Sequence, residues 1–275
     1  MLSVFGDESA DGAKQRVFAV AGVIGSEDMW QQLEAEWITR TNGTPFHARD
    51  CDSDQEDYAN VPHAENKALY RELVIMLANS GLGGWGFAID LAAQRRVFPD
   101  APDISYYKGF LEVLQAMRNC AFNNQETVKF TFDMRRESEH NAGLLYGMFR
   151  EMPEWSQVMF SEVSFACSRD QPRLQAADLF AREAMKLFDN SFGPIKREPR
   201  KSWLALRDTG RFHVEAISDD WFQDLKKQMP AMEQARGQSR SDYVLWLKQH
   251  KQQHSTTNLF RYIEWKARTG SGAES

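Results

Sequence analysis

The sequence is poor in cysteine and has no long apolar run. Its 275 residues include three cysteines, Cys51, Cys120 and Cys167, which are far apart in the chain. This odd, scattered set argues against a disulfide framework and a thiolate zinc site, and it is typical of a reduced, cytoplasmic setting. No apolar stretch approaches the roughly 20 residues that span a bilayer. No basic flank precedes the short apolar stretch at the N-terminus, so we expect neither a signal peptide nor a membrane partner.

Signatures of three common site types are also missing. The glycines of 81–86 enter a predicted strand, whereas a dinucleotide-binding loop leaves a strand for a helix. Ser9 lacks the context of a nucleophile elbow, so no Ser-His-Asp triad is expected. The acidic run 50–54 begins like a calcium loop, but Gln55 and Val61 stand where that loop requires glycine and glutamate.

The composition is that of an ordinary globular protein, with 42% hydrophobic and 26% charged residues. The net charge of -6 differs from the basic balance of many nucleic-acid binders, whose affinity depends on phosphate contacts. The segment 195–211 is nevertheless basic. Its cations are Lys196, Arg197, Arg200, Lys201, Arg207 and Arg211. Two interpretations carry equal weight: a solvated helix face with its flanking loop, or a phosphate-binding surface.

Strand and helix patterns alternate along the first two thirds of the chain. Apolar runs predict strands at 2–8, 16–24, 85–91, 127–133 and 158–167. Three- and four-residue spacing predicts helices at 28–41, 65–78, 105–122, 139–150 and 174–188. The first two strands should form an antiparallel hairpin, and 44–62 reads as an acidic loop. Together these elements predict an α/β fold with a mixed sheet flanked by helices.

The character of the sequence changes after Gly193. We therefore predict a first domain over 1–193, a helical C-terminal extension over 194–268 and a disordered tail over 269–275. Apolar and aromatic residues at 243–247 predict a packing or dimer surface, so a homo-oligomer or a protein partner would use these C-terminal helices.

Three aspartates are the strongest functional signal. Asp178 lies on the apolar stripe of its helix, beyond the first turn, so helix capping does not explain it. It is either a buried carboxylate paired with an Arg or Trp, or a functional group. Asp7 and Asp133 each follow an apolar strand, where an aspartate is often only a turn or cap residue. Two strand ends and one helix face can, however, gather all three around a divalent ion, as in metal-dependent nucleases.

Two further residues are candidates for supporting roles. His47, with Asp50 nearby, is either a proton shuttle close to the carboxylates or a loop histidine satisfied by its neighbour. Gln175 either orients a carboxylate or caps its helix.

These motifs, taken in order, resemble a known family. Phe5-Gly6-Asp7-Glu8-Ser9, Phe46-His47, Phe132-Asp133, Leu174–Leu179 and Arg200-Lys201-Ser202 are similar to the family called domain of unknown function 3800. The resemblance covers roughly 1 to 225. Here Ala10 follows Ser9 where the family usually has glycine.

The resemblance implies a ribonuclease H-like fold with acidic residues on the first strand, the fourth strand and the final helix. It implies Asp7, Asp133 and Asp178 as metal ligands, with Glu8 as an additional ligand. Together with the residues themselves, it favours an Mg²⁺- or Mn²⁺-dependent nuclease acting on DNA or RNA, with Arg200 and Lys201 on backbone phosphates. The alternative is an inactive ribonuclease H-like module that binds nucleic acid or protein.

Overall fold

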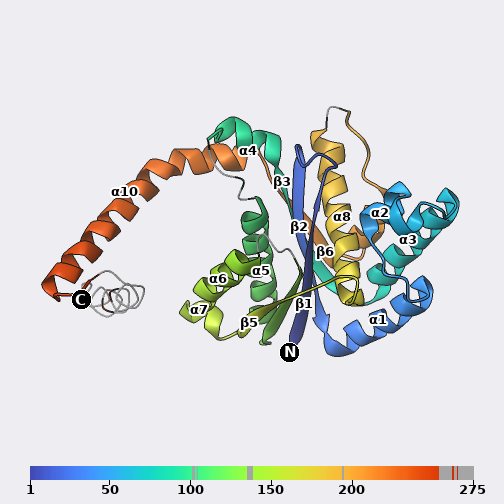
Figure 1. Cartoon of the computed structure of the whole chain (residues 1–275), viewed down its shortest axis with the longest axis horizontal. Coiled ribbons are helices and arrows are strands. Elements are labelled where there is room, and N and C mark those ends of the chain that lie inside the picture. Colours follow the sequence, from blue (N-terminus) through green and yellow to red (C-terminus); the bar gives the residue numbers. More distant parts are fainter. Residues whose placement is uncertain are drawn as a thin grey trace. The chain divides into compact units, whose positions relative to one another are not determined.

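The computed structural model describes residues 1–100, 103, 105–134, 139–193, 195–253, 262 and 265. The side chains of 153–154, 160–162, 231–237 and 239–240 are not described. The chain divides into two compact units, Met1–Asp219 and Asp220–Ser275 (Figure 1). The tail predicted over 269–275 lies outside the described residues.

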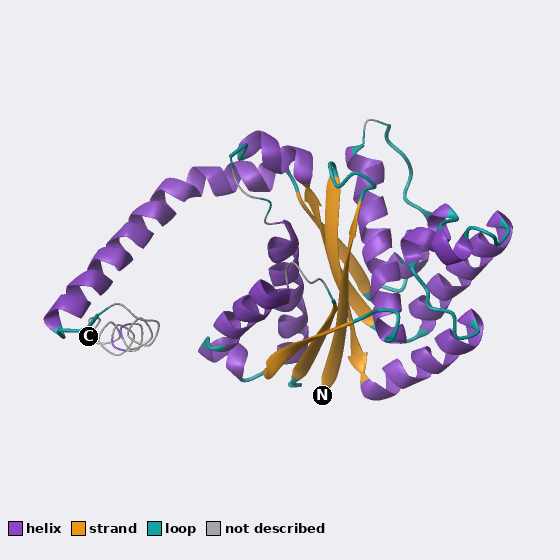
Figure 2. Ribbon diagram, in the orientation of Figure 1, coloured by secondary structure: helices purple, strands orange, loops and turns teal. Residues whose placement is uncertain are grey.

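A six-stranded mixed sheet forms the centre of the first unit (Figure 2). Its strands are β1 (Leu2–Ala10), β2 (Val17–Ser26), β3 (Gly83–Asp90), β4 (Val128–Asp133), β5 (Met159–Ala166) and β6 (Phe212–Ile217). They lie in the order β5-β4-β1-β2-β3-β6, in which β1, β2 and β3 pair antiparallel and the other pairs are parallel. The predicted α/β fold is therefore confirmed, and the strand arrangement is consistent with a ribonuclease H-like sheet.

Helices cover both faces of this sheet. They are α1 (Glu27–Thr41), α2 (Ala48–Ser53), α3 (His63–Asn79), α4 (Leu91–Val97), α5 (Ser105–Asn123), α6 (Glu139–Arg150), α7 (Pro153–Ser156), α8 (Pro172–Phe192) and α9 (Lys201–Arg207), with a 3-10 turn η1 (Glu56–Tyr58). Helix α8 packs across β1, β2 and β3, with α1, α3 and α9 beside it, whereas α5 lies on the opposite face (Figure 1). The sheet is thus buried on both sides.

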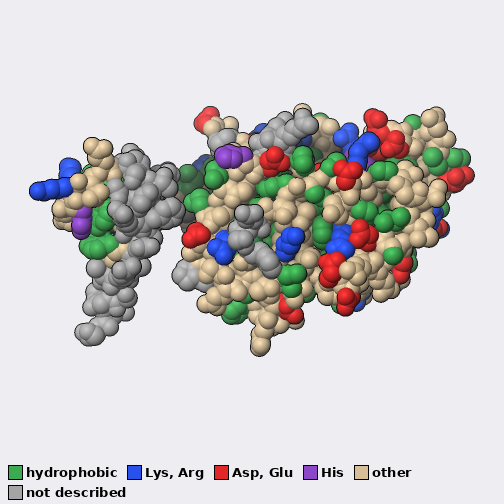
Figure 3. All heavy atoms as spheres, turned by 60° about the horizontal axis from the view of Figure 1, so that its bottom comes forward, with side chains coloured by type: hydrophobic (Ala, Val, Ile, Leu, Met, Phe, Trp, Pro, Cys, Tyr) green, Lys and Arg blue, Asp and Glu red, His purple; other side chains and the backbone are tan. Residues whose placement is uncertain are grey.

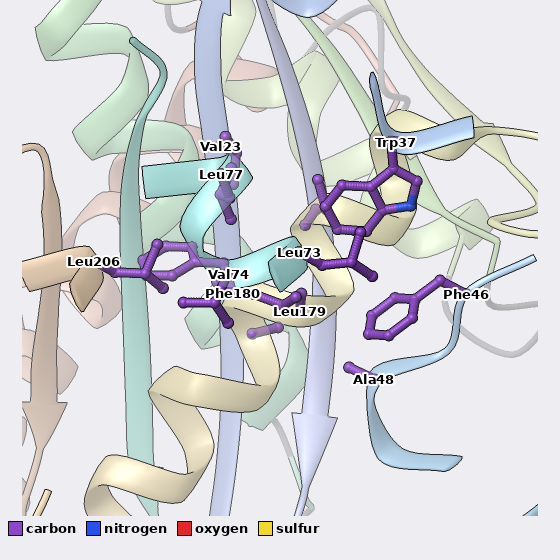
Figure 4. Packing of buried hydrophobic residues seen from close by; sticks show 14 of the residues in the cluster. Val23, Trp37, Phe46, Ala48, Leu73, Val74, Leu77, Leu179, Phe180 and Leu206 are labelled. Atoms are coloured by element: carbon purple, nitrogen blue, oxygen red, sulfur yellow. The ribbon is translucent and has the colours of Figure 1, made fainter. Parts of the chain in front are cut away.

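The larger core cluster joins α8 to the helices beside it. Figure 4 shows Trp37, Phe46 and Ala48 near Leu73, with Leu179 and Phe180 of α8 farther along the same cluster. The rings of Trp37 and Phe46 pack edge to face, with 5.6 Å between their centroids. Such packing fixes the segment before α2 against α8, because aromatic side chains bury large areas in defined orientations.

The structure differs from the sequence prediction in three places. The predicted loop 44–62 contains α2 and η1, and α4 follows β3 directly. Strand β6, within the stretch predicted as a helical extension from 194, pairs with β3. The first unit consequently runs to Asp219, past the domain boundary predicted at 193.

The second unit contains most of α10 (Asp219–Gln249) and an aromatic cluster of its own. Tyr243, Trp246 and Leu247 are buried together with Tyr262. Of the stretch 243–247, these three side chains thus pack within this unit, whereas Val244 and Leu245 are exposed. None of the helices in the described part of the chain has the length and apolarity needed to cross a membrane.

Candidate carboxylate site

Asp7 and Asp133 project from neighbouring strands on the same face of the sheet. In the parallel pairing of β1 with β4, Gly6 lies opposite Phe132, so the two aspartates follow at the next position on each strand. Side chains alternate between the two faces of a strand. Phe5, two residues before Asp7, belongs to the core on the α8 side, which places Asp7 on that side too. The sequence predicts that Asp133 and Phe132 point to opposite faces of their strand, and this register agrees with that prediction.

Asp178 approaches the same face from α8. It is buried, and its Oδ2 accepts a 2.7 Å hydrogen bond from the backbone N–H of Ala48. A purely structural interpretation of Asp178 predicts an Arg or Trp side chain as its partner. The observed hydrogen bond comes from a backbone amide instead. Helix and strands thus gather three carboxylates close enough for their charges to act on one another.

Each of the three carboxylates is held through one oxygen. Oδ1 of Asp7 accepts the N–H of Glu8 at 2.7 Å, and Oδ1 of Asp133 accepts the N–H of Ser168 at 2.8 Å. Together with the bond from Ala48 to Asp178, these backbone amides fix the orientation of the groups. Within the described residues, the second oxygen of each aspartate accepts no hydrogen bond, and no Lys or Arg pairs with any of the three.

The electrostatics of Asp7 reflect this concentration of negative charge. Burial raises the pKa of Asp7 well above its ordinary value. The negative charges of Asp178, Glu8 and Asp133 raise this pKa further, whereas the hydrogen bond from the Glu8 amide lowers it. A buried anion with anionic neighbours is costly unless a proton or a cation compensates it.

Asp178 is perturbed in the same direction. Burial raises its pKa from 3.8 to about 6, with a contribution from the charge of Asp133. His47, the Ala48 amide and Arg182 act in the opposite direction. Such perturbed acids concentrate at functional sites.

Glu8 lies on the other face of the sheet. It pairs with Val20 across the antiparallel ladder, and residues paired in this way share a face. Val20 faces α5, because a Cβ added at Gly109 of α5 would lie 2.5 Å from its Cγ2. The structure therefore separates Glu8 from the face that carries Asp7, although the resemblance implied it as an additional ligand.

Gln175 connects the loops that carry the holding amides. Its Oε1 accepts hydrogen bonds from Trp37 Nε1 at 3.0 Å and from the N–H of Phe46 at 3.1 Å. Its Nε2 donates to the carbonyl of Ser168 at 2.9 Å. Phe46 lies two residues before Ala48, whose N–H holds Asp178, and the N–H of Ser168 holds Asp133. Gln175 therefore positions the backbone amides that hold two of the carboxylates. The sequence allows Gln175 either to orient a carboxylate or to cap its helix; the structure places its amide on the backbone segments next to the carboxylates.

His47 stands at the edge of the site. It is exposed, and its Nδ1 lies 2.6 Å from Asp50 Oδ2. This is the neighbour contact that the sequence allowed, and the charge of His47 also acts on Asp178. Its Nε2 has no hydrogen-bond partner among the described residues.

Arg200 has internal partners instead of an open surface. Its Nη2 and Nη1 donate to Asp52 at 2.7 and 3.1 Å, and Arg182 donates to the same carboxylate at 2.9 Å. The Nε of Arg200 lies 3.5 Å from the Oε1 of fully buried Glu183, and this oxygen also accepts a hydrogen bond from the hydroxyl of Tyr70. This ion-pair network, one turn of α8 beyond Asp178, gives no sequence signal, because its members are far apart in the chain.

The basic segment 195–211 is only partly available to a ligand. Arg211 donates to the carbonyls of Ala78 and Leu82, whereas Lys201 is exposed at the start of α9. On the face drawn in Figure 3, acidic and basic side chains of the larger unit are intermingled. Of the pair predicted to contact phosphates, Lys201 is the one that remains accessible.

The chemistry of the three aspartates fits a hard divalent cation. Carboxylate oxygens are the ligands of Mg²⁺ and Mn²⁺, and one oxygen of each group accepts no hydrogen bond from a described residue. In the part of the chain that the structure describes, however, no three His, Cys, Asp or Glu side chains are arranged to hold a metal ion as they stand. Binding would therefore require the carboxylates to turn towards one another.

Comparison with known proteins gives no further assignment: no family model matches the chain, and no curated protein does either. The resemblance to the domain of unknown function 3800 family therefore stays a prediction.

Proposed function

We propose that this chain is a divalent-metal-dependent nuclease of the ribonuclease H-like kind, similar to the family of domain of unknown function 3800, and that it hydrolyses phosphodiester bonds of DNA or RNA. One observation carries the proposal. Three carboxylates from β1, β4 and α8 share one face of the sheet, each with one oxygen fixed by a backbone amide, and none of them pairs with a Lys or Arg among the described residues. A purely structural role would leave this charge uncompensated.

The roles of the residues follow from their positions. Asp7 and Asp133 would hold Mg²⁺ or Mn²⁺ between neighbouring strands, and Asp178 would complete the site from the helix. The ion, when bound, would supply activation of a water and stabilisation of the leaving oxygen. His47 is oriented by Asp50, so its Nε2 would carry a proton to or from the reacting groups. Lys201 would contact a backbone phosphate.

Cleavage of labelled single- and double-stranded DNA and RNA, in Mg²⁺, Mn²⁺ or EDTA, tests the proposal. The wild type should cut at least one substrate in the presence of metal, and Asp7→Asn and Asp178→Asn should abolish cutting while the protein stays folded. Asp28→Asn is the matched control, because Asp28 is an exposed aspartate on α1 outside the site. Cutting retained in both Asn variants contradicts the proposal, and no cutting on any substrate favours the inactive binding module.

A further inference from the structure

A cavity lies beside the carboxylate site and has no role in the function proposed so far. Its volume is about 280 Å³, and its walls come from the segment 45–58 and the turn after β5. Among its lining residues are Phe46, His47, Asp57, Ser168 and Arg169. Ligand pockets usually measure roughly 300–1,000 Å³, so this one has room for a single small planar group.

The cavity and the carboxylates share their supporting residues. Ser168 lines the cavity, and its N–H holds Asp133. Phe46 and Ser168 are joined through Gln175, and His47 precedes the amide that holds Asp178. A group in the cavity would therefore lie directly next to a group bound at the carboxylates.

The walls combine apolar rings with unused charges of both signs. Phe46 and Tyr58 are buried, with ring centroids 6.3 Å apart, and form the apolar part. Asp50 is engaged with His47, but neither Asp57 nor Arg169 has a hydrogen bond or ion pair with a described residue. Both side chains are exposed to the cavity and free to contact a ligand.

This lining disfavours a phosphate and favours a base. The carboxylates of Asp50 and Asp57 repel an anion, whereas a carboxylate accepts hydrogen bonds from the amino group of cytosine or adenine. Thymine and uracil place a carbonyl oxygen at that position, which a carboxylate rejects. A guanidinium such as that of Arg169 stacks on a base or donates to its edge.

We infer that this cavity receives an unpaired nucleobase adjacent to the bond that is cut, and that Asp57 selects cytosine or adenine over thymine or uracil. The inference rests on the proposed function for the position of the cut. A base inside a duplex cannot enter such a cavity without being flipped out of its stack, and flipping is unfavourable. The preferred substrate class is thus single-stranded nucleic acid.

Equilibrium binding in EDTA tests the inference without relying on cleavage. Fluorescein-labelled oligo(dC) and oligo(dT) of about 12 nucleotides suit an anisotropy titration, because a single-strand site spans roughly 4–16 nucleotides. The wild type should bind oligo(dC) about tenfold more tightly than oligo(dT), the discrimination expected of one good base contact. A blunt duplex of the same length should bind about tenfold more weakly than oligo(dC).

Matched variants assign the preference to the cavity. Asp57→Asn should bring the two oligonucleotides to within about twofold of each other, because an amide can donate to thymine as well as accept from cytosine. Asp28→Asn should leave the preference unchanged. Arg169→Ala should weaken binding of both oligonucleotides, whereas Arg71→Ala, an exposed arginine on α3, should not.

The outcomes separate this inference from the proposed nuclease. Equal affinity for oligo(dC) and oligo(dT) in the wild type, an unchanged preference in Asp57→Asn, or duplex binding as tight as single-strand binding would overturn it. If the Asp57-dependent preference is found but no substrate is ever cut, the base site stands and the nuclease proposal fails. If cutting is metal-dependent but independent of strandedness and of Asp57, the nuclease stands and the base site fails.

Discussion

Neutralising Asp178 should stabilise the folded protein at neutral pH. The carboxyl keeps its proton to about pH 6 in the folded state, compared with an ordinary value of 3.8. At about 1.4 kcal/mol per pKa unit, this difference corresponds to about 3 kcal/mol of lost stability once the group is ionised in both states. Asp178→Asn removes the charge and keeps an oxygen that can accept the Ala48 N–H.

The pH dependence follows from the direction of this shift. Below about pH 4 the carboxyl is protonated in both states and has no effect on stability. Between about pH 4 and 6 the folded state binds more protons than the unfolded state, so wild-type stability falls as the pH rises. Relative to the wild type, Asp178→Asn should therefore gain about 1–3 kcal/mol at pH 7.5 and close to nothing near pH 4.

Urea unfolding followed by tryptophan fluorescence, at several pH values in EDTA, measures this gain. Asp52→Asn provides the opposite control. Burial works against the ionisation of Asp52, but Arg200 and Arg182 outweigh it and lower its pKa. Removing the Asp52 charge should therefore destabilise the protein by roughly 3 kcal/mol, because Arg200 and Arg182 lose the carboxylate that they share. If Asp178→Asn destabilises the protein equally at pH 7.5 and pH 4, our account of the carboxylate charge is wrong.

Two further substitutions test the supporting structure. Gly6→Ala should destabilise the fold by about 1–3 kcal/mol, since the new Cβ would lie 2.3 Å from the buried ring of Phe132. Gly143→Ala should have a neutral or stabilising effect in the same urea titration, because its new Cβ would lie more than 4 Å from every described atom outside its own helical turn. Gln175→Ala should destabilise the fold by about 2–4 kcal/mol, because it removes the acceptor of two buried N–H groups and the donor to the part-buried carbonyl of Ser168. Its effect on cleavage should exceed that of an equally destabilising core substitution.

The elements around the site follow clear local patterns. The β1–β2 hairpin and the α8 helix appear in the sequence as apolar runs and apolar stripes of sufficient length. Side-chain alternation gives the strand face on which Asp7 and Asp133 each lie, whereas the pairing of β1 with β4 that sets them side by side is a non-local contact. The position of Asp178 on the apolar stripe is visible in the same way, because a charge there breaks the pattern.

The sequence carries only a weak signal for strand β6. Apolar Phe212, Val214 and Ala216 alternate with His213 and Glu215, as is typical of a strand with one solvated face. The run is only six residues long and follows a basic segment that resembles a helix. Pairing with β3, which fixes this stretch as a strand, is a non-local contact.

The partners of charged residues could not be read from the sequence. Arg200 lies in a basic run, so a phosphate contact was expected, yet its carboxylate partner Asp52 is 148 residues away. Glu8 is adjacent to Asp7 in sequence but faces the other side of the sheet. Tertiary contacts decide the partner of Arg200, and local spacing contains no information about it, whereas the opposite face of Glu8 follows from the alternation of side chains along β1.

Binding of Mn²⁺ measures the central claim most directly. Titration of the folded protein, followed by the electron paramagnetic resonance signal of free Mn²⁺, counts bound ions without requiring a substrate. The wild type should bind at least one ion, and Asp7→Asn, Asp133→Asn and Asp178→Asn should each lose that site, whereas Asp28→Asn should keep it. Binding that is absent from the wild type, or unchanged in the three site variants, would contradict a carboxylate-bound metal centre.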